Sequence, residues 1–149
     1  MEPIYKIVRI KQVVREAELS NVDVIRSPED GADIVHQLIG DDDREVFLVI
    51  CLSTKNGVIA VHRARVGAVN ASIAHPREIF KSAILNNAES IIIAHNHPSS
   101  DPSPSPEDIQ VTKRMLEAGK IVGIEVLDSL IVDSNSNKHV SLKEKCYIN

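Results

Sequence analysis

The feature that most constrains the fold is a turn signal, Asn56-Gly57, between two apolar segments. The first segment, Glu45 to Leu52, is dense in Val, Ile, Leu and Phe, and the second segment, Val58 to Val66, is rich in Val and Ile. Asn-Gly is a strong short-range signal for a β-hairpin because both residues tolerate a positive φ. Segments of β-branched residues favour strands. We therefore expect the two segments to pair as antiparallel strands.

Three other segments begin with helix signals. Ser27-Pro28-Glu29-Asp30 combines a Ser cap, a Pro in the first turn and acidic residues beside the positive end of the helix dipole. Gly40 is expected to end this helix. A second helix is expected from Pro76 through about Asn87, and a third from Ser105-Pro106-Glu107-Asp108 to Gly119. Helical spacing predicts that the first two helices bury Ile34, Val35, Leu38, Ile39, Ile79, Phe80, Ala83 and Ile84.

The remaining apolar segments are expected to complete a sheet. Ser90 to Ala94 is typical of a buried strand, and Ile121 to Leu127 and Leu130 to Val132 of two more. Ile4 to Val14 mixes apolar and basic residues in partial alternation, which fits an edge strand or hairpin arm, or a loosely attached arm. The order of elements favours an α/β sandwich with a mixed central sheet. Residues 1–26 would be the N-terminal arm or edge strand, and residues 27–149 the domain.

Composition limits the class of protein. The 149 residues are 43% apolar, which is enough for one packed core and one domain. The net charge of −4 lacks the basic footprint of nucleic-acid-binding proteins, so we expect no nucleic-acid partner for this chain alone.

The lack of a recognisable targeting signal and the low number of cysteines favour a cytoplasmic location. Met1 to Lys6 shows no signal-peptide pattern, and no apolar run reaches membrane-spanning length, so no membrane association is expected. Cys51 and Cys146 are too few for a disulfide framework, which fits a reducing compartment. Cys51 lies in an apolar run and is expected to be a buried small hydrophobic residue.

Two histidines at the end of the buried strand carry the strongest functional signal. Residues two apart on a strand point to the same side, so His95 and His97 present both imidazoles in one direction while Asn96 faces the other way. Asp108, in the first turn of the next helix, can fold back to complete a His-His-Asp set. Three such ligands leave a fourth tetrahedral position for water, the arrangement of catalytic zinc. A His-x-His with Asp at one fixed offset is expected by chance only about 0.015 times in this composition.

The tetrapeptide Ser-Pro-Glu-Asp occurs twice, at residues 27–30 and 105–108, and only the second copy follows a His-x-His. By itself the tetrapeptide is an N-terminal helix signature. Ser105 can therefore be a helix cap alone, a donor to an oxyanion, or both. The alternative for the whole set is two surface histidines beside a helix-capping acid.

A hydrolytic zinc site also needs a carboxylate that takes a proton from water and later gives it to the leaving group. Glu45 is the best-placed acid because it begins an apolar strand and can lie at a sheet end. Asp41, Asp42 and Asp43 are typical of a solvated turn. From the residues alone, a solvated position stays open for Glu45 as well.

These residues together resemble a known family. His95-Asn96-His97-Pro98, the Ser-x-x-Asp ending at Asp108, and the upstream Glu45 are similar to the JAMM (JAB/MPN) metalloprotease motif. The fuller runs Ala94 to Ser99, His75 to Phe80 and Leu127 to Val132 resemble the bacterial RadC-like branch. The resemblance covers about residues 27–145.

The resemblance implies a cytidine-deaminase-like α/β/α sandwich that holds zinc on His95, His97 and Asp108. In JAMM enzymes the Glu that matches Glu45 is the acid/base, and the Ser that matches Ser105 supports the oxyanion. Those enzymes cleave amide or isopeptide bonds, so the expected partner is a protein or peptide substrate. The sequence leaves the substrate and a homo-oligomeric state open.

Two departures from the family pattern matter. Ser100 stands where family members usually have Gly, so the loop backbone is expected to differ there. RadC-like proteins often carry an upstream helix-hairpin-helix DNA-binding module, for which the 26 residues before Ser27 are too few. We therefore expect a bare catalytic domain, and a DNA-repair role is suggested by the family name only.

Other functional classes fit less well. A zinc-holding, catalytically silent scaffold that binds a protein partner is the main alternative, although such a scaffold does not need Glu45. HNH nucleases spread their His-Asn-His letters over a ββα metal unit, whereas here the three residues are consecutive. A cytidine deaminase needs Pro-Cys-x-x-Cys ligands, which this chain lacks.

Overall fold

The computed structural model describes residues 1–20, 22–67, 74–98, 101–134 and 136–149. Over these residues it has a sheet with the strand order β2-β1-β3-β4-β5. The elements along the chain are α1 (Pro28–Ile39), β1 (Val46–Leu52), β2 (Val58–Val66), α2 (Pro76–Ile79), α3 (Lys81–Leu85), β3 (Ser90–His97), α4 (Pro106–Val122), β4 (Glu125–Asp133) and β5 (His139–Ser141).

The predicted hairpin is confirmed, since β1 pairs antiparallel with β2. The turn runs from Ser53 to Asn56, so the predicted dipeptide lies at its end and not at its centre. The amide of Asn56 donates to the carbonyl of Ser53 at 3.0 Å, and Asn56 adopts φ 60°. Asn tolerates this left-handed conformation better than most residues do. Strand β3 pairs antiparallel with β1 and parallel with β4, and β5 is antiparallel to β4, so the sheet is mixed as predicted.

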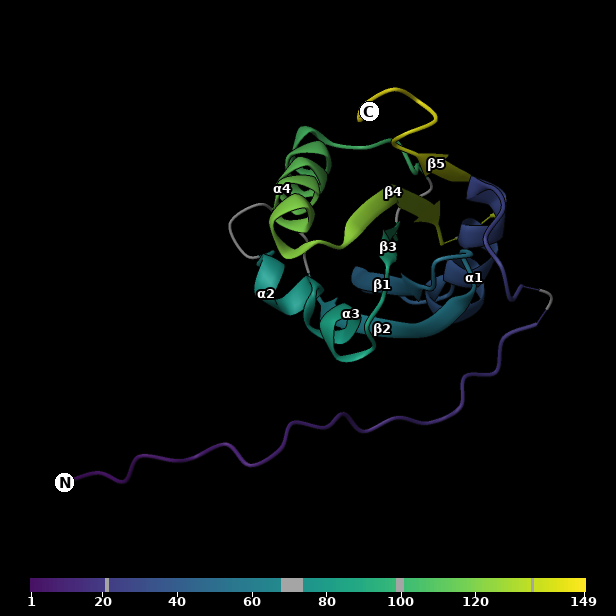
Figure 1. Cartoon of the computed structure of the whole chain (residues 1–149). Helices are drawn as coiled ribbons and strands as arrows, with labels where there is room; N and C mark the ends of the chain where they lie inside the picture. The colour runs from purple at the N-terminus through teal and green to yellow at the C-terminus, as the bar shows by residue number, and fades with distance from the viewer. Residues whose placement is uncertain (21, 68–73, 99–100, 135) are drawn as a thin grey trace.

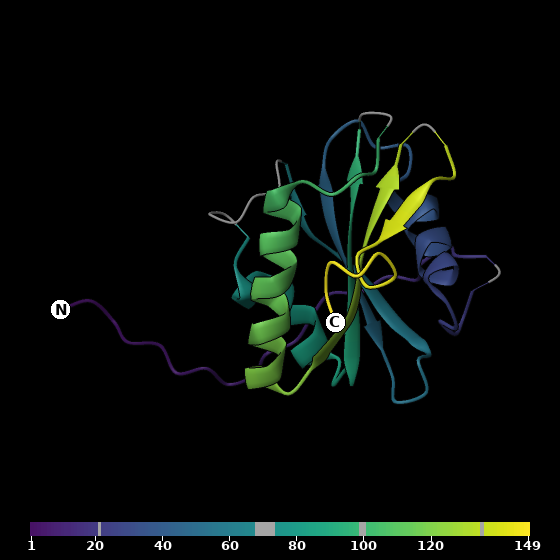
Figure 2. The ribbon, with the colours of Figure 1, turned by 90° about the horizontal axis from the view of Figure 1, so that it is seen from above.

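Helices cover both faces of the sheet. Figure 2 shows α1 on one side of the strands and α4 on the other, with α2 and α3 on the α4 side. Side chains alternate along β1: Phe47, Val49 and Cys51 pack toward α2, α3 and α4, whereas Leu48, Ile50 and Leu52 pack toward α1. Because β1 is buried on both faces it reads as a continuous apolar run. The predicted α/β/α sandwich is therefore confirmed.

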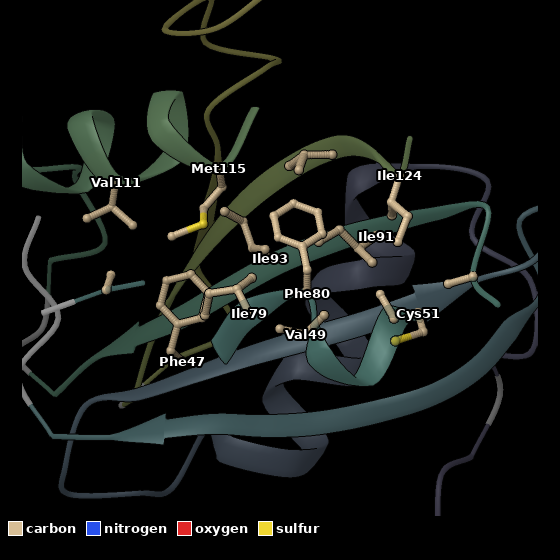
Figure 3. Close-up of a cluster of buried hydrophobic side chains, with 14 residues drawn as sticks. Phe47, Val49, Cys51, Ile79, Phe80, Ile91, Ile93, Val111, Met115 and Ile124 are labelled. Atoms are coloured by element: carbon tan, nitrogen blue, oxygen red, sulfur yellow. The ribbon is translucent and has the colours of Figure 1, made fainter. Parts of the chain in front are cut away.

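The larger core lies between the sheet and α2, α3 and α4 (Figure 3). Phe80 from the connection between α2 and α3 and Phe47 from β1 are both buried there, and Met115 of α4 is fully enclosed. Burying one such side chain stabilises the fold by about 1.5–3 kcal/mol. This core fixes α4 against the sheet, and with it the start of α4 beside the end of β3.

The second predicted helix is wrong in one respect, because it is two short helices. The helix is interrupted at Phe80, which keeps right-handed helical dihedrals (φ −88°, ψ −6°) and separates α2 from α3. Phe80 and Ala83 are buried in the core but Ile84 is 55% exposed, so the prediction that Ile84 is buried is wrong. No Gly or Pro stands at this interruption.

The third predicted helix continues past Gly119 to Val122. Gly123, at φ 82°, is the residue that ends α4 in the left-handed conformation. The two predicted strands that follow, 121–127 and 130–132, are one strand, β4, that begins at Glu125. The short strand β5 was not predicted.

Gly119 serves close packing instead of helix termination. A Cβ at this position would lie 2.4 Å from the backbone oxygen of Ile124. Ala favours helix over Gly by about 1 kcal/mol, but overpacking costs about 1–3 kcal/mol. We expect Gly119→Ala to lose about 1 kcal/mol or more of unfolding free energy in urea titrations. Lys120→Ala, on the exposed side of α4, should stay within about 0.5 kcal/mol of the parent.

Residues 1–20 form neither helix nor strand; they run outside the domain, and the N-terminus lies well away from it (Figure 1). The structure has no strand at Ile4 to Val14, so the edge-strand interpretation does not describe it, and the division into an arm and a domain stays a prediction. The side chain of Gln12 exchanges hydrogen bonds with that of Asn86, at 2.9 and 3.2 Å. Val24 forms an isolated bridge with Gly57. None of the helices in the described part of the chain is long and apolar enough to cross a bilayer.

The two cysteines are both free, and they differ in environment. Cys51 is buried in β1 as predicted, and burial raises the pKa of its thiol despite a contact with Ser82. A raised pKa lowers the thiolate fraction, the form that reacts with alkylating reagents. We expect iodoacetamide to modify exposed Cys146 in the folded protein and Cys51 only after unfolding, as peptide mass mapping would measure. Equal modification of both cysteines in the native state would contradict this burial.

Candidate metal centre

Strand β3 reaches beyond the predicted Ala94 and includes both histidines. As predicted, the side chains of His95 and His97 lie on one side of the strand, and that of Asn96 lies on the other. His95 is buried and its ring is stacked on Phe47, with centroids 6.3 Å apart. The Nε2 atoms of the two histidines are 3.3 Å apart. The sheet therefore directs two imidazole nitrogens to one point.

Asp108 reaches the same point from the first turn of α4. Its carboxylate oxygens lie 3.1 Å from His95 Nε2 and 3.2 Å from His97 Nε2. A capping box holds it: the amide of Ser105 donates to Asp108 Oδ2 at 2.8 Å, and the amide of Asp108 donates to Ser105 Oγ at 3.1 Å. Helix capping thus orients the carboxylate toward the histidines.

The earlier Ser-Pro-Glu-Asp copy folds differently. Ser27 precedes α1 but makes no side-chain capping bond, and Asp30 accepts instead from the amide of Arg26 at 2.8 Å. No histidine pair faces Asp30 among the described residues that can form a metal-binding group. The two copies share a helix-start function, and only the second is brought to the His-x-His.

His95, His97 and Asp108 form a group whose ligand atoms all lie within 4.8 Å of one another, so they can hold a metal ion. The carbonyl of Asp101 lies 3.0 Å from His97 Nδ1. Because a carbonyl can only accept, Nδ1 carries a proton, and a neutral ring in this tautomer would offer its Nε2 lone pair to a metal bound in place of the Nε2 proton that faces Asp108. Two imidazole nitrogens and one carboxylate, largely buried, fit the donor set of an open zinc site.

The charges at this group favour a cation. Burial alone would raise the pKa of Asp108, but its hydrogen bonds with His95 and His97 outweigh burial and hold the pKa well below its ordinary value. The pKa of His97 is raised, chiefly by its hydrogen bond with Asp108 and against the effect of burial. Asp108 is thus an anion at neutral pH, as a metal ligand must be.

Glu45 lies immediately before β1 and is partly buried. Phe47 pairs with His95 across the β1 and β3 ladder, so the antiparallel register brings Glu45, two residues earlier, to the level of His97. The negative charge of Glu45 makes a smaller contribution to the raised pKa of His97. The amide of Gly67 donates to the Glu45 carbonyl at 2.7 Å. Its acid/base role remains a prediction.

Ser105 is exposed, and the structure shows its hydroxyl as the acceptor in the capping box. Its predicted role at an oxyanion also remains a prediction. The Ser100 departure falls outside the described residues.

Two contributions to the site could not be found from the sequence. The carbonyl of Asp101, which orients His97, is a backbone group and leaves no signal in residue type. The side chain of Asn96 bonds to the chain around Glu45 (2.7–3.2 Å). In the sequence, this contact is indicated only by the position of polar Asn96 at the end of an otherwise apolar segment.

Comparison with known proteins agrees with the motif. The family model for the RadC-like JAB domain matches residues 25–147. A UPF0758 protein of Geobacillus sp. (strain WCH70) is 56% identical over 125 residues, which are 84% of this chain and 54% of that relative. A UPF0758 protein of Desulforamulus reducens is 52% identical over 122 residues, 82% of this chain and 53% of the relative. A UPF0758 protein of Bacillus pumilus is 50% identical over 125 residues, which are 84% of this chain and 55% of that relative.

The chain therefore spans about half the length of the curated relatives it matches. The match includes every residue of the His-His-Asp group and Glu45. With the site geometry and the family match in agreement, the chain belongs to the RadC-like JAB domain family.

Proposed function

We propose that this domain is a zinc-dependent hydrolase that cleaves amide or isopeptide bonds in a protein or peptide substrate. The observation that carries the proposal is the convergence of His95 Nε2, His97 Nε2 and the Asp108 carboxylate within 4.8 Å, beside Glu45. Membership of the JAB family supports a metal-dependent hydrolase in general. In the proposal these three residues hold the zinc.

A zinc ion on three protein ligands supplies an acidified water and polarises a carbonyl. Glu45 would accept the proton of the attacking water on its carboxylate and deliver it to the nitrogen of the leaving amine. The Ser105 oxygen accepts from the Asp108 amide, which leaves its own O–H free to donate to the oxygen of the substrate carbonyl. The free cysteines, Cys51 and Cys146, are compatible with action in the reducing cytoplasm.

Metal content tests the ligand set. Elemental analysis of the purified protein should find about one zinc per chain, and His97→Ala should weaken zinc binding by more than about 100-fold, since even the loss of an outer partner costs 10–100-fold. His139→Ala is the matched control, because this histidine lies on β5, contacts Glu29 at 4.0 Å and is not a member of the His-His-Asp group. Absence of stoichiometric zinc, or full retention in His97→Ala, would overturn the assignment.

Turnover separates the hydrolase from a silent zinc scaffold. Both would bind zinc equally, but only the hydrolase releases amines from peptide and isopeptide libraries. A Glu45→Gln variant that binds substrate without turning it over is the bait for identifying protein substrates in a lysate of the source organism. A zinc-loaded parent that releases no product from any library would support the scaffold.

A further inference from the structure

We propose that Asn96 is a positioning residue that fixes Glu45 relative to the metal ligands. The inference rests on the proposed role of Glu45 as the acid/base and adds a residue to that machinery. Asn96 stands between His95 and His97, and its side chain points to the other side of β3.

All three hydrogen bonds of the Asn96 amide go to the segment around Glu45. Its Oδ1 accepts from the amide of Val46 at 2.7 Å, and its Nδ2 donates to the carbonyls of Arg44 at 2.8 Å and Asp42 at 3.2 Å. The bonds to Arg44 and Val46 therefore hold the backbone on both sides of Glu45. One donor N–H and two acceptor carbonyls also determine which end of the amide is oxygen.

Asn96 is buried, so its side-chain amide depends on these three protein partners. Its exposed fraction is 0%, so water cannot replace a lost partner. A buried polar group without a partner is costly, and the Asp42–Val46 segment is therefore held in the one position that satisfies the amide.

Other contacts of the segment are weaker or do not reach β3. Asp42 pairs with Arg63 at 3.0 Å and with Arg44 at 3.5 Å, and both arginines are largely exposed, where ion pairs contribute little. The Gly67 amide bonds to the Glu45 carbonyl from beyond β2. Asn96 is the buried side chain that ties this segment to the strand of the metal ligands.

Because side chains of β3 alternate between the two faces of the sheet, the triplet His95-Asn96-His97 has two structural roles. Its outer residues direct nitrogens to the metal site, and its central residue holds the segment that carries Glu45. Since β3 carries both histidines and the side chain that holds the Glu45 segment, a shift of β3 would move the two histidine ligands and Glu45 together. The distance between the metal site and the acid/base is preserved in this way, as proton transfer requires.

Hydrogen exchange of the parent protein tests the contact directly. The Val46 amide should be protected like the β1 ladder amide of Val49, since its acceptor is buried. In Asn96→Leu, which has similar size and no hydrogen bonds, exchange at Val46 should accelerate about tenfold relative to Val49, the effect of losing one hydrogen bond. Free exchange of Val46 in the parent would overturn the proposal.

Two variants separate positioning from folding. Asn96→Asp keeps the acceptor for Val46 but loses both donors to the carbonyls, so it guards against failure of Asn96→Leu to fold. Each variant should retain zinc, with kcat lowered about 100-fold and KM unchanged, because misplacement of about 1 Å costs that much. Ile92→Val is the matched control: it removes one buried methylene from the same face of β3 and should leave kcat unchanged.

A readout besides activity distinguishes failure of this inference from failure of the proposed function. The ¹³C resonance of the Glu45 side-chain carboxyl should shift when zinc is added to the parent and to Ile92→Val, and shift much less in Asn96→Leu and Asn96→Asp. An equal response in all four proteins would overturn the positioning role. If Glu45→Gln retained full hydrolysis, the proposed acid/base role of Glu45 would fail, while the exchange and resonance results would still decide whether Asn96 holds the Asp42–Val46 segment.

Discussion

Replacing Glu45 with Gln is expected to lower kcat by about 10²–10⁴-fold, the contribution typical of a general acid/base, and to leave the zinc content unchanged. Gln keeps the size of Glu and still accepts hydrogen bonds, but its amide takes no proton at neutral pH. The register of β1 against β3 brings Glu45 to the level of His97, yet Glu45 is outside the His-His-Asp group. Its loss should therefore remove proton transfer and spare the metal.

The measurement pairs steady-state hydrolysis with elemental analysis of the same samples. Glu117→Gln is the control, since this exposed glutamate of α4 pairs with Lys120 at 3.2 Å on the surface of the described helix and should not affect kcat. Full activity of Glu45→Gln would exclude the acid/base role. Loss of zinc in Glu45→Gln would instead make Glu45 a fourth ligand and would require a different proton acceptor.

The parts of the fold that were predictable rest on local signals. The hairpin of β1 and β2, the buried run of β3 and the starts of α1 and α4 each depend on residues within a few positions of one another. The split of α2 from α3 could not be predicted, because it falls at Phe80 without a Gly or Pro in the sequence, and Phe80 packs into a core built from distant strands. Gly119 was expected to end α4, but the helix continues one turn to Gly123, and the close approach of Gly119 is to the backbone of Ile124 just beyond that end.

In the candidate site, too, the residues that follow from local patterns were predictable, and those that depend on strand pairing were not. His-x-His on a strand and Ser-x-x-Asp at a helix start are short patterns whose geometry follows from the local element, so the group of His95, His97 and Asp108 was visible in the sequence. The bonds of Asn96 join residues about fifty positions apart, and only pairing of β1 with β3 creates them. Glu45 is intermediate, because residue type suggested it and the strand register brought it near.

Replacing Asp108 with Ala is expected to have two separable effects on stability. The metal-free protein should lose about 1 kcal/mol or more, because Asp108 is a member of the capping box of α4. Zinc at 100 times its Kd should stabilise the parent by about 2.7 kcal/mol, and this increment should vanish in the variant. Urea unfolding with and without zinc measures both quantities.

The repeated tetrapeptide supplies the controls. Ser105→Ala removes the cap that accepts from the Asp108 amide, and Asp30→Ala removes the equivalent acid of the first copy, which bonds only to the Arg26 amide in the described contacts. Each should cost about 1 kcal/mol and leave the zinc increment intact. A zinc increment that persists in Asp108→Ala would reject this ligand. An increment lost in Ser105→Ala would instead show that the carboxylate of Asp108 needs its cap to face His95 and His97, a demand that the first copy of the tetrapeptide, without a histidine pair before it, does not meet.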